Sequence, residues 1–121
     1  MVIMKKHFLV IAGCGAGSPD SITPEVRAAV EWAEVLVGER RLLDLFPESR
    51  AENIAAGDSI EKVIQEIEAR RAVMRIVVLV AGDPGLSPLA DPLVRRFGRD
   101  TCRFIPAVSG TQTPGKDILT E

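Results

Sequence analysis

Three short segments of the sequence contain glycine and break the apolar pattern at the points where predicted strands end. They are GCGAG at 13–17, AGDPG at 81–85 and IPAVSG at 105–110. In the second segment, glycine permits close approach of the backbone, while Pro84 fixes its own φ and biases Asp83 toward an extended conformation. Backbone groups beside one carboxylate favour a ligand with a positive centre and hydrogen-bond donors of its own.

S-adenosylmethionine fits this description, because it carries a sulfonium, an ammonium and ribose hydroxyls. A phosphate fits poorly, because the carboxylate of Asp83 would repel it. The alternative interpretation is structural: Asp-Pro-Gly is a common turn sequence, and Asp83 would then only cap the next helix.

The glycines of the 13–17 loop also resemble a dinucleotide-binding fingerprint, GxGxxG. The third glycine of that motif should stand at Ser18, and a helix should open at once so that its first amides meet the pyrophosphate. Pro19 and Pro24 instead extend the loop, although Glu39 is placed to bind a ribose. A nicotinamide or flavin site therefore stays open as an alternative.

Three further features have a simpler explanation than a site. The GxxxxGK match at 110–116 is followed by Asp117, where a P-loop requires a hydroxyl for magnesium, so the match is ascribed to chance. Cys14 has no motif that pairs it with a base, and a packing role is favoured. Arg40 and Arg41 could face a polycarboxylate substrate, but a solvated helix face is favoured.

Strands and helices are predicted to alternate along the chain, which favours parallel strands joined by right-handed crossovers. The expected fold is α/β: a three-layer domain with a mainly parallel sheet of about five strands. A capping box from Asp58 to Glu61 is expected to open the clearest helix, whose apolar residues are Ile60, Val63, Ile64 and Ile67. The predicted strands are 8–12, 35–37, 51–54, 75–81 and 103–105, and the other predicted helices are 24–33, 40–46 and 89–97.

Composition favours one globular domain without nucleic-acid or membrane partners. The 121 residues are 46% hydrophobic and 26% charged, with a formal net charge of -2 and no block of like charge. No apolar run approaches the length of a membrane span, and no signal peptide is recognisable, so a cytoplasmic location is expected. Cys14 and Cys102 lack ligand spacing, so neither a disulfide nor a zinc site is expected.

Taken in order, the segments resemble the tetrapyrrole methylase family, whose members methylate corrin precursors and uroporphyrinogen with S-adenosylmethionine. The resemblance covers residues 7–112, and VGERRLLDLFP at 37–47 is most similar to the precorrin-6Y methyltransferase branch of cobalamin biosynthesis. The segments that carry it are GCGAGSPD at 13–20, TPE at 23–25, AEVLVGER at 33–40, VVLVAGDPG at 77–85 and FIPAVSG at 104–110.

The resemblance implies specific site residues. The cofactor S-adenosylmethionine is expected to contact Gly82, Asp83, Pro84, Ser109 and Gly110. The tetrapyrrole is expected beside Gly13, Cys14, Gly15, Ala16 and Gly17. No catalytic base is implied, and Ala16 and Ala107 replace residues that are usually proline and glycine in the family.

The resemblance also implies a second domain, because the family continues past Gln112 into another half that completes the cleft. Residues 1–121 are therefore expected to be one domain, the N-terminal half of a two-domain methylase, and inactive in isolation. Its expected partners are the second domain, the precorrin substrate and, through self-association, a second copy. The alternatives are a dinucleotide-binding fragment of an oxidoreductase and a non-catalytic α/β interaction module.

Overall fold

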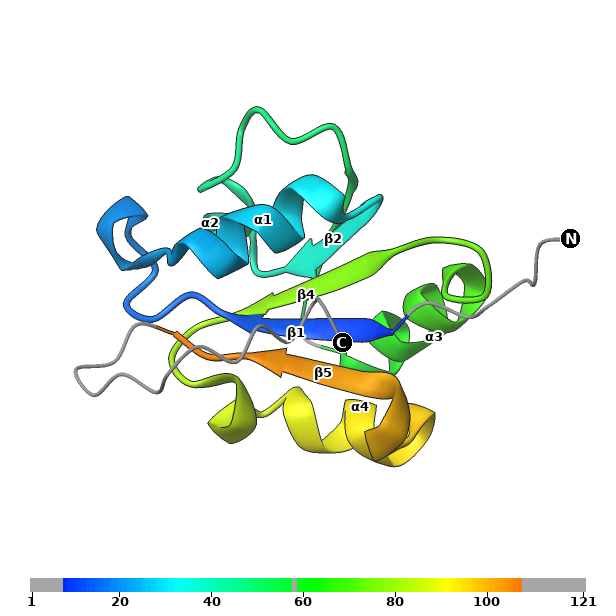
Figure 1. Ribbon diagram of the computed structural model, residues 1–121. Helices are drawn as coiled ribbons and strands as arrows, with labels where there is room; N and C mark the ends of the chain where they lie inside the picture. Colours follow the sequence, from blue (N-terminus) through cyan, green and yellow to red (C-terminus); the bar gives the residue numbers. More distant parts are fainter. Residues whose placement is uncertain (1–7, 58, 108–121) are drawn as a thin grey trace, which may run out of the picture.

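The computed structural model describes residues 8–57 and 59–107, which form a five-stranded sheet with helices on both faces (Figure 1). The strands are β1 (Leu9–Gly13), β2 (Val35–Gly38), β3 (Glu52–Ala55), β4 (Ile76–Val80) and β5 (Cys102–Ile105). The helices are α1 (Pro24–Trp32), α2 (Arg40–Leu43), α3 (Ile60–Arg70) and α4 (Ala90–Phe97), with 3-10 turns at Pro19–Ser21, Pro84–Leu86 and Arg99–Thr101. The predicted alternation of strands and helices is confirmed.

Strands β1 and β4 form the centre of the sheet because they are apolar on both faces. Every residue of both strands is buried, as expected for parallel strands covered by helices on each side. All pairings are parallel, and the strand order is β3-β2-β4-β1-β5. The first strand of the chain therefore lies between β4 and β5, two strands that come much later in the sequence.

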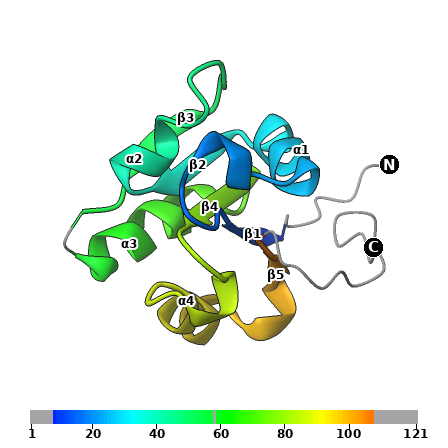
Figure 2. The ribbon, with the colours of Figure 1, turned by 90° about the vertical axis from the view of Figure 1, so that its left-hand side faces the viewer.

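The sheet separates two apolar cores, because successive residues of a strand point to opposite faces. One core joins α1 and α2 to the sheet, and the other joins α3 and α4 to it. Figure 2, which turns the carboxyl ends of the strands toward the viewer, shows these helix pairs on opposite sides. The first core includes Val10, Ala12, Leu36, Val77 and Leu79 from the strands, and the second includes Leu9, Ile11, Val35, Val37 and Val78.

Helix α1 begins where the sequence predicts it. The Thr23 hydroxyl accepts a hydrogen bond from the backbone N–H of Val26 at 3.1 Å, and Pro24 occupies the first turn. Val26, Ala29 and Val30 then lie at helical spacing and are buried against the sheet.

Two helix predictions need correction. Helix α3 is capped by Ser59, whose hydroxyl accepts from the N–H of Lys62 at 3.2 Å, in place of the predicted cap at Asp58, which lies outside the described residues. Helix α2 ends at Leu43, short of the predicted end at residue 46, because Leu45 and Phe46 donate to carbonyls three residues earlier and tighten the chain before Pro47.

Candidate functional site

The candidate site lies at the carboxyl ends of β1 and β4. The chain leaves β1 toward α1 on one face of the sheet and leaves β4 toward α4 on the other. In open α/β sheets, ligands bind where neighbouring strands send their connections to opposite faces. This topology selects the two loops that the sequence analysis singled out, 13–17 and 81–85.

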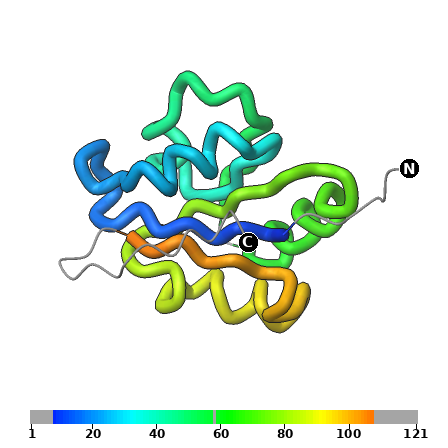
Figure 3. Tube along the Cα trace, in the orientation of Figure 1, coloured from blue at the N-terminus to red at the C-terminus, as the bar shows by residue number. Residues whose placement is uncertain are grey.

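The two loops leave the same edge of the sheet (Figure 3), and backbone hydrogen bonds join them. The N–H of Cys14 donates to the carbonyl of Val80 at 2.7 Å, and the N–H of Gly82 donates to the carbonyl of Gly15 at 2.8 Å. Gly15 and Gly82 form an isolated antiparallel bridge beyond the end of the parallel sheet. The relative position of the loops is thus fixed by backbone geometry, independently of any ligand.

All three glycine-containing segments meet at Gly13. A Cβ placed on Gly13 would lie 2.7 Å from the Gly82 carbonyl oxygen, 2.7 Å from Pro84 Cδ and 3.1 Å from the Ala107 nitrogen. Only glycine fits this close approach. Ala107 is the last described residue, so the predicted cofactor residues Ser109 and Gly110 lie outside the described part of the chain.

Around Asp83 the backbone is extended, as predicted, with φ -79° and ψ 131°. Gly82 has φ +72°, a conformation that favours glycine, and a Cβ there would meet nothing within 4 Å, so the backbone of Gly82 is open to close approach. Close approach of a ligand at this position stays a prediction. Asp83 is exposed and makes no side-chain capping hydrogen bond, while Pro84 is buried. The alternative role of Asp83 as a helix cap is therefore not found.

Ser21, which the sequence analysis overlooked, holds the 13–17 loop in place. Its hydroxyl oxygen lies 2.8 Å from the carbonyl oxygens of both Cys14 and Ser18, which share its single proton, and accepts from the N–H of Ser18 at 3.2 Å. The signal in the sequence was the Ser18–Ser21 spacing, which is that of two reciprocally capping residues. Gly15 and Gly17 complete the loop with φ +59° and +82°.

The thiol of Cys14 belongs to the apolar core beside α1, as the packing interpretation predicted. Burial raises its pKa from 9.0 to about 11, and the positive charge of Arg41 offsets only part of that effect. A thiol with this pKa stays protonated at neutral pH and is a poor nucleophile.

Arg41 lies closer to the loop than the sequence suggested. A Cβ on Gly17 would collide with its Nη1 atom, so the guanidinium rests against Gly17. Its Nε donates to Glu39 Oε1 at 3.2 Å, and 57% of the side chain remains exposed. Arg40 is also exposed, as a solvated helix face requires, and of the two arginines it is Arg41 that lies against Gly17.

Residues 9–114 match the family of tetrapyrrole (corrin/porphyrin) methylases. The chain belongs to this family. It is 35% identical over 104 residues to the cobalt-precorrin-7 C(5)-methyltransferase of Salmonella typhimurium, an alignment that covers 86% of this chain and 51% of that protein. The chain thus spans about half the length of the curated relatives it matches.

Solved structures of methylases share the fold. A cobalt precorrin-4 methyltransferase superposes with a TM-score of 0.67 at 30% identity, over 84% of this chain and 46% of that one. The precorrin-6Y methylase of Archaeoglobus fulgidus superposes with a TM-score of 0.64 at 27% identity, over 85% and 54%. These matches confirm the predicted fold class and the predicted family.

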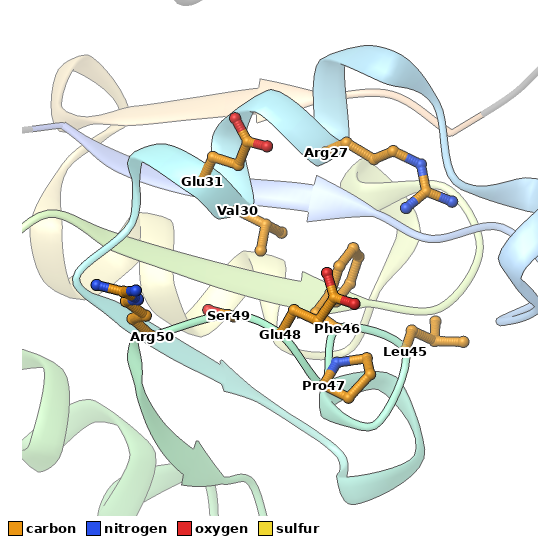
Figure 4. Close-up of a pocket in the computed structure, with 9 residues that line it drawn as sticks. All are labelled: Arg27, Val30, Glu31, Leu45, Phe46, Pro47, Glu48, Ser49 and Arg50. Carbon is orange, nitrogen blue, oxygen red and sulfur yellow. The ribbon is translucent and has the colours of Figure 1, made fainter.

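One cavity among the described residues does not coincide with the predicted site. It has a volume of about 510 Å³ and lies between α1 and the segment after α2 (Figure 4). Arg27, on its rim, donates to the carbonyl of Pro19 at 3.3 Å. The floor is apolar, with Val30 and Phe46, and the rim carries both Glu48 and Arg50. No predicted site residue lines it.

Within residues 8–57 and 59–107, no three side chains of His, Cys, Asp and Glu come together to hold a metal ion. None of the helices in the same ranges has the length and hydropathy needed to cross a membrane.

Proposed function

We propose that the chain forms the donor-binding half of a methyltransferase that acts on a tetrapyrrole precursor of cobalamin. The observation that carries the proposal is the meeting of the 13–17 and 81–85 loops at Gly13, at the switch point of the sheet, in a chain of this family. The similarity to a cobalt-precorrin-7 methyltransferase supports a corrin precursor as the substrate.

S-adenosylmethionine is the proposed donor, and the described residues fit it. Gly82 leaves open space where any other residue would place a Cβ, and Asp83, the next residue in the chain, is exposed. The donor supplies an electrophilic methyl group on a cationic sulfur. The carboxylate favours that cation electrostatically, while Gly82 and Pro84 fix the backbone that faces it. Ser109 and Gly110 are proposed to complete the site.

The 13–17 loop is proposed to face the tetrapyrrole. Ala16 is exposed, and Gly15 and Gly17 are partly exposed, so these three residues present the contact surface. Gly13 and Cys14 are buried and act from beneath by fixing the path of the loop. Methyl transfer by displacement needs alignment of the two reactants more than it needs a protein nucleophile.

The domain organisation is part of the proposal. We infer that the cleft needs a second domain, as in a two-domain methylase, and that the chain in isolation has weak affinity for S-adenosylmethionine. The coverage of about half of each relative supports this inference. Micromolar binding of the donor by the 121-residue chain alone would contradict it.

The experiment uses a paired protein, in which the full chain is fused to the part of the Salmonella relative that the alignment leaves uncovered. Calorimetric titration should show binding of S-adenosylhomocysteine and no binding of NAD. Asp83→Asn should weaken binding of S-adenosylmethionine about tenfold, because the carboxylate no longer offsets the sulfonium charge. Asp20→Asn, which changes an exposed carboxylate on the 13–21 connection, is the control.

The alternatives predict different results in the same titration. Binding of NAD without S-adenosylhomocysteine would indicate an oxidoreductase fragment. Binding of neither by a folded paired protein would indicate a non-catalytic interaction module.

A further inference from the structure

We propose that Arg41 binds a peripheral carboxylate of the tetrapyrrole and thereby selects acidic substrates. This inference rests on the function proposed above and adds a substrate-binding residue to it. It begins from the contact between two segments that follow different strands: the 13–17 loop after β1 and helix α2 after β2.

Gly17 makes room for the guanidinium. A Cβ at this position would collide with Nη1 of Arg41, and the φ of +82° also disfavours any other residue. The Arg41 side chain thus occupies the place that a side chain at position 17 would take. The positive charge is carried on the surface of the loop proposed to face the tetrapyrrole.

One neighbour orients the guanidinium of Arg41 and leaves most of its hydrogen-bond donors available. Glu39 accepts from Nε at 3.2 Å, and among the described residues Arg41 donates no other side-chain hydrogen bond. Both terminal nitrogens therefore remain for a ligand, and more than half of the side chain is exposed. Two parallel N–H groups match the two oxygens of a carboxylate, which is the geometry that arginine recognises best.

The charges along this edge are arranged in a way that suits two reactants of opposite charge. Arg41 rests against Gly17 of the loop, whereas Gly15 is bridged to Gly82, the residue that precedes Asp83. The acidic side chain paired with Arg41 among the described residues is Glu39, which is itself exposed. The carboxylate of Asp83 suits a cationic donor, and the guanidinium of Arg41 suits an anionic acceptor.

The test compares two stable corrins that differ at the ring periphery. Cobyrinic acid carries free carboxylates, and cobinamide carries amides in their place. The paired protein, with S-adenosylhomocysteine bound, should bind cobyrinic acid at least about tenfold more tightly than cobinamide, because only the carboxylate gains a charge-assisted pair. Arg41→Gln should remove this preference and leave the affinity for cobinamide and for S-adenosylhomocysteine unchanged.

Two variants separate recognition from a structural role. Arg40→Gln removes a neighbouring exposed charge and should keep the full preference. Arg41→Lys keeps the charge without the paired donors and should keep part of the preference for cobyrinic acid.

The proposal is overturned if Arg41→Gln retains the preference for cobyrinic acid, or if it weakens the binding of both corrins equally. A paired protein that binds S-adenosylhomocysteine but shows no preference between the corrins overturns the role of Arg41 and leaves the proposed function intact. Loss of S-adenosylhomocysteine binding in the unmutated paired protein overturns the proposed function and this inference with it.

Discussion

Gly13 is the residue at which one methyl group matters most. In Gly13→Ala the new Cβ would stand 2.7 Å from the Gly82 carbonyl oxygen and from Pro84 Cδ, both of which belong to a turn fixed by backbone bonds. The loops must then move apart, so we expect the free energy of unfolding to fall by about 1–3 kcal/mol. Urea denaturation followed by circular dichroism measures this change.

Gly57→Ala is the matched control, because a Cβ at Gly57 would meet nothing within 4 Å. The same measurement should show a change within about 0.5 kcal/mol. Equal destabilisation by both substitutions would mean that the close approach at Gly13 does not constrain the loops.

Cys14 gives a prediction for alkaline pH. Burial raises the pKa of its thiol from 9.0 to about 11, so the folded state holds the proton more tightly than the unfolded state. The resulting stabilisation is fully present below pH 9.0 and is lost as the pH rises through about 11. We expect iodoacetamide to label Cys14 at mildly alkaline pH only after urea unfolds the protein, measured by mass spectrometry in Cys102→Ala. Rapid labelling of the folded protein would show that the thiol is accessible.

At the scale of elements, the entry into α1 depends on one hydroxyl. Thr23→Ala removes the acceptor for the N–H of Val26, and we expect a loss of about 1 kcal/mol in unfolding free energy. Thr23→Ser keeps the hydroxyl and should restore most of the stability in the same urea titration. If serine is as destabilising as alanine, the methyl group of Thr23 matters more than its hydrogen bond.

The strands and α1 could be predicted because their signals are local. β1 and β4 are continuous apolar runs, and the sequence Thr23-Pro24-Glu25 indicates the start of a helix. The two errors concerned competing local signals. Asp58 and Ser59 both suit a cap, and the hydroxyl of Ser59 makes the bond. The apolar spacing of 40–46 suits a helix, but the chain tightens after Leu43.

At the scale of the whole molecule, stability should decrease from the centre of the sheet to its edges. β1 and β4 are fully buried and paired on both sides, whereas β3 is an edge strand whose residues are mostly exposed. Arg70 of α3 holds this edge through Glu52, at 2.8 Å. We expect hydrogen exchange to be slowest in β1 and β4 and fastest in β3. Uniform exchange across the sheet would contradict this order.

The meeting of the loops could be predicted from the sequence, because parallel strands end at the same edge of a sheet. The contacts that define the candidate site could not. The Gly15–Gly82 bridge and the packing of Arg41 on Gly17 each join segments distant in sequence, and no local pattern reports which pair will touch. The Arg40–Arg41 pair at the start of a helix suggested a solvated face. Only the contact of Arg41 with Gly17 in space suggests a role in substrate binding.

The position of β1 has a consequence for synthesis of the chain. Of the five strands in this sheet, the apolar β1 is translated before the others, yet both of its neighbours, β4 and β5, are translated after β2 and β3. Until β4 and β5 have been made, the nascent chain therefore holds a hydrophobic strand with two unpaired edges, which is the kind of segment that chaperones bind. Messages truncated before residue 102 would leave that strand permanently half covered, so their products should aggregate and be degraded.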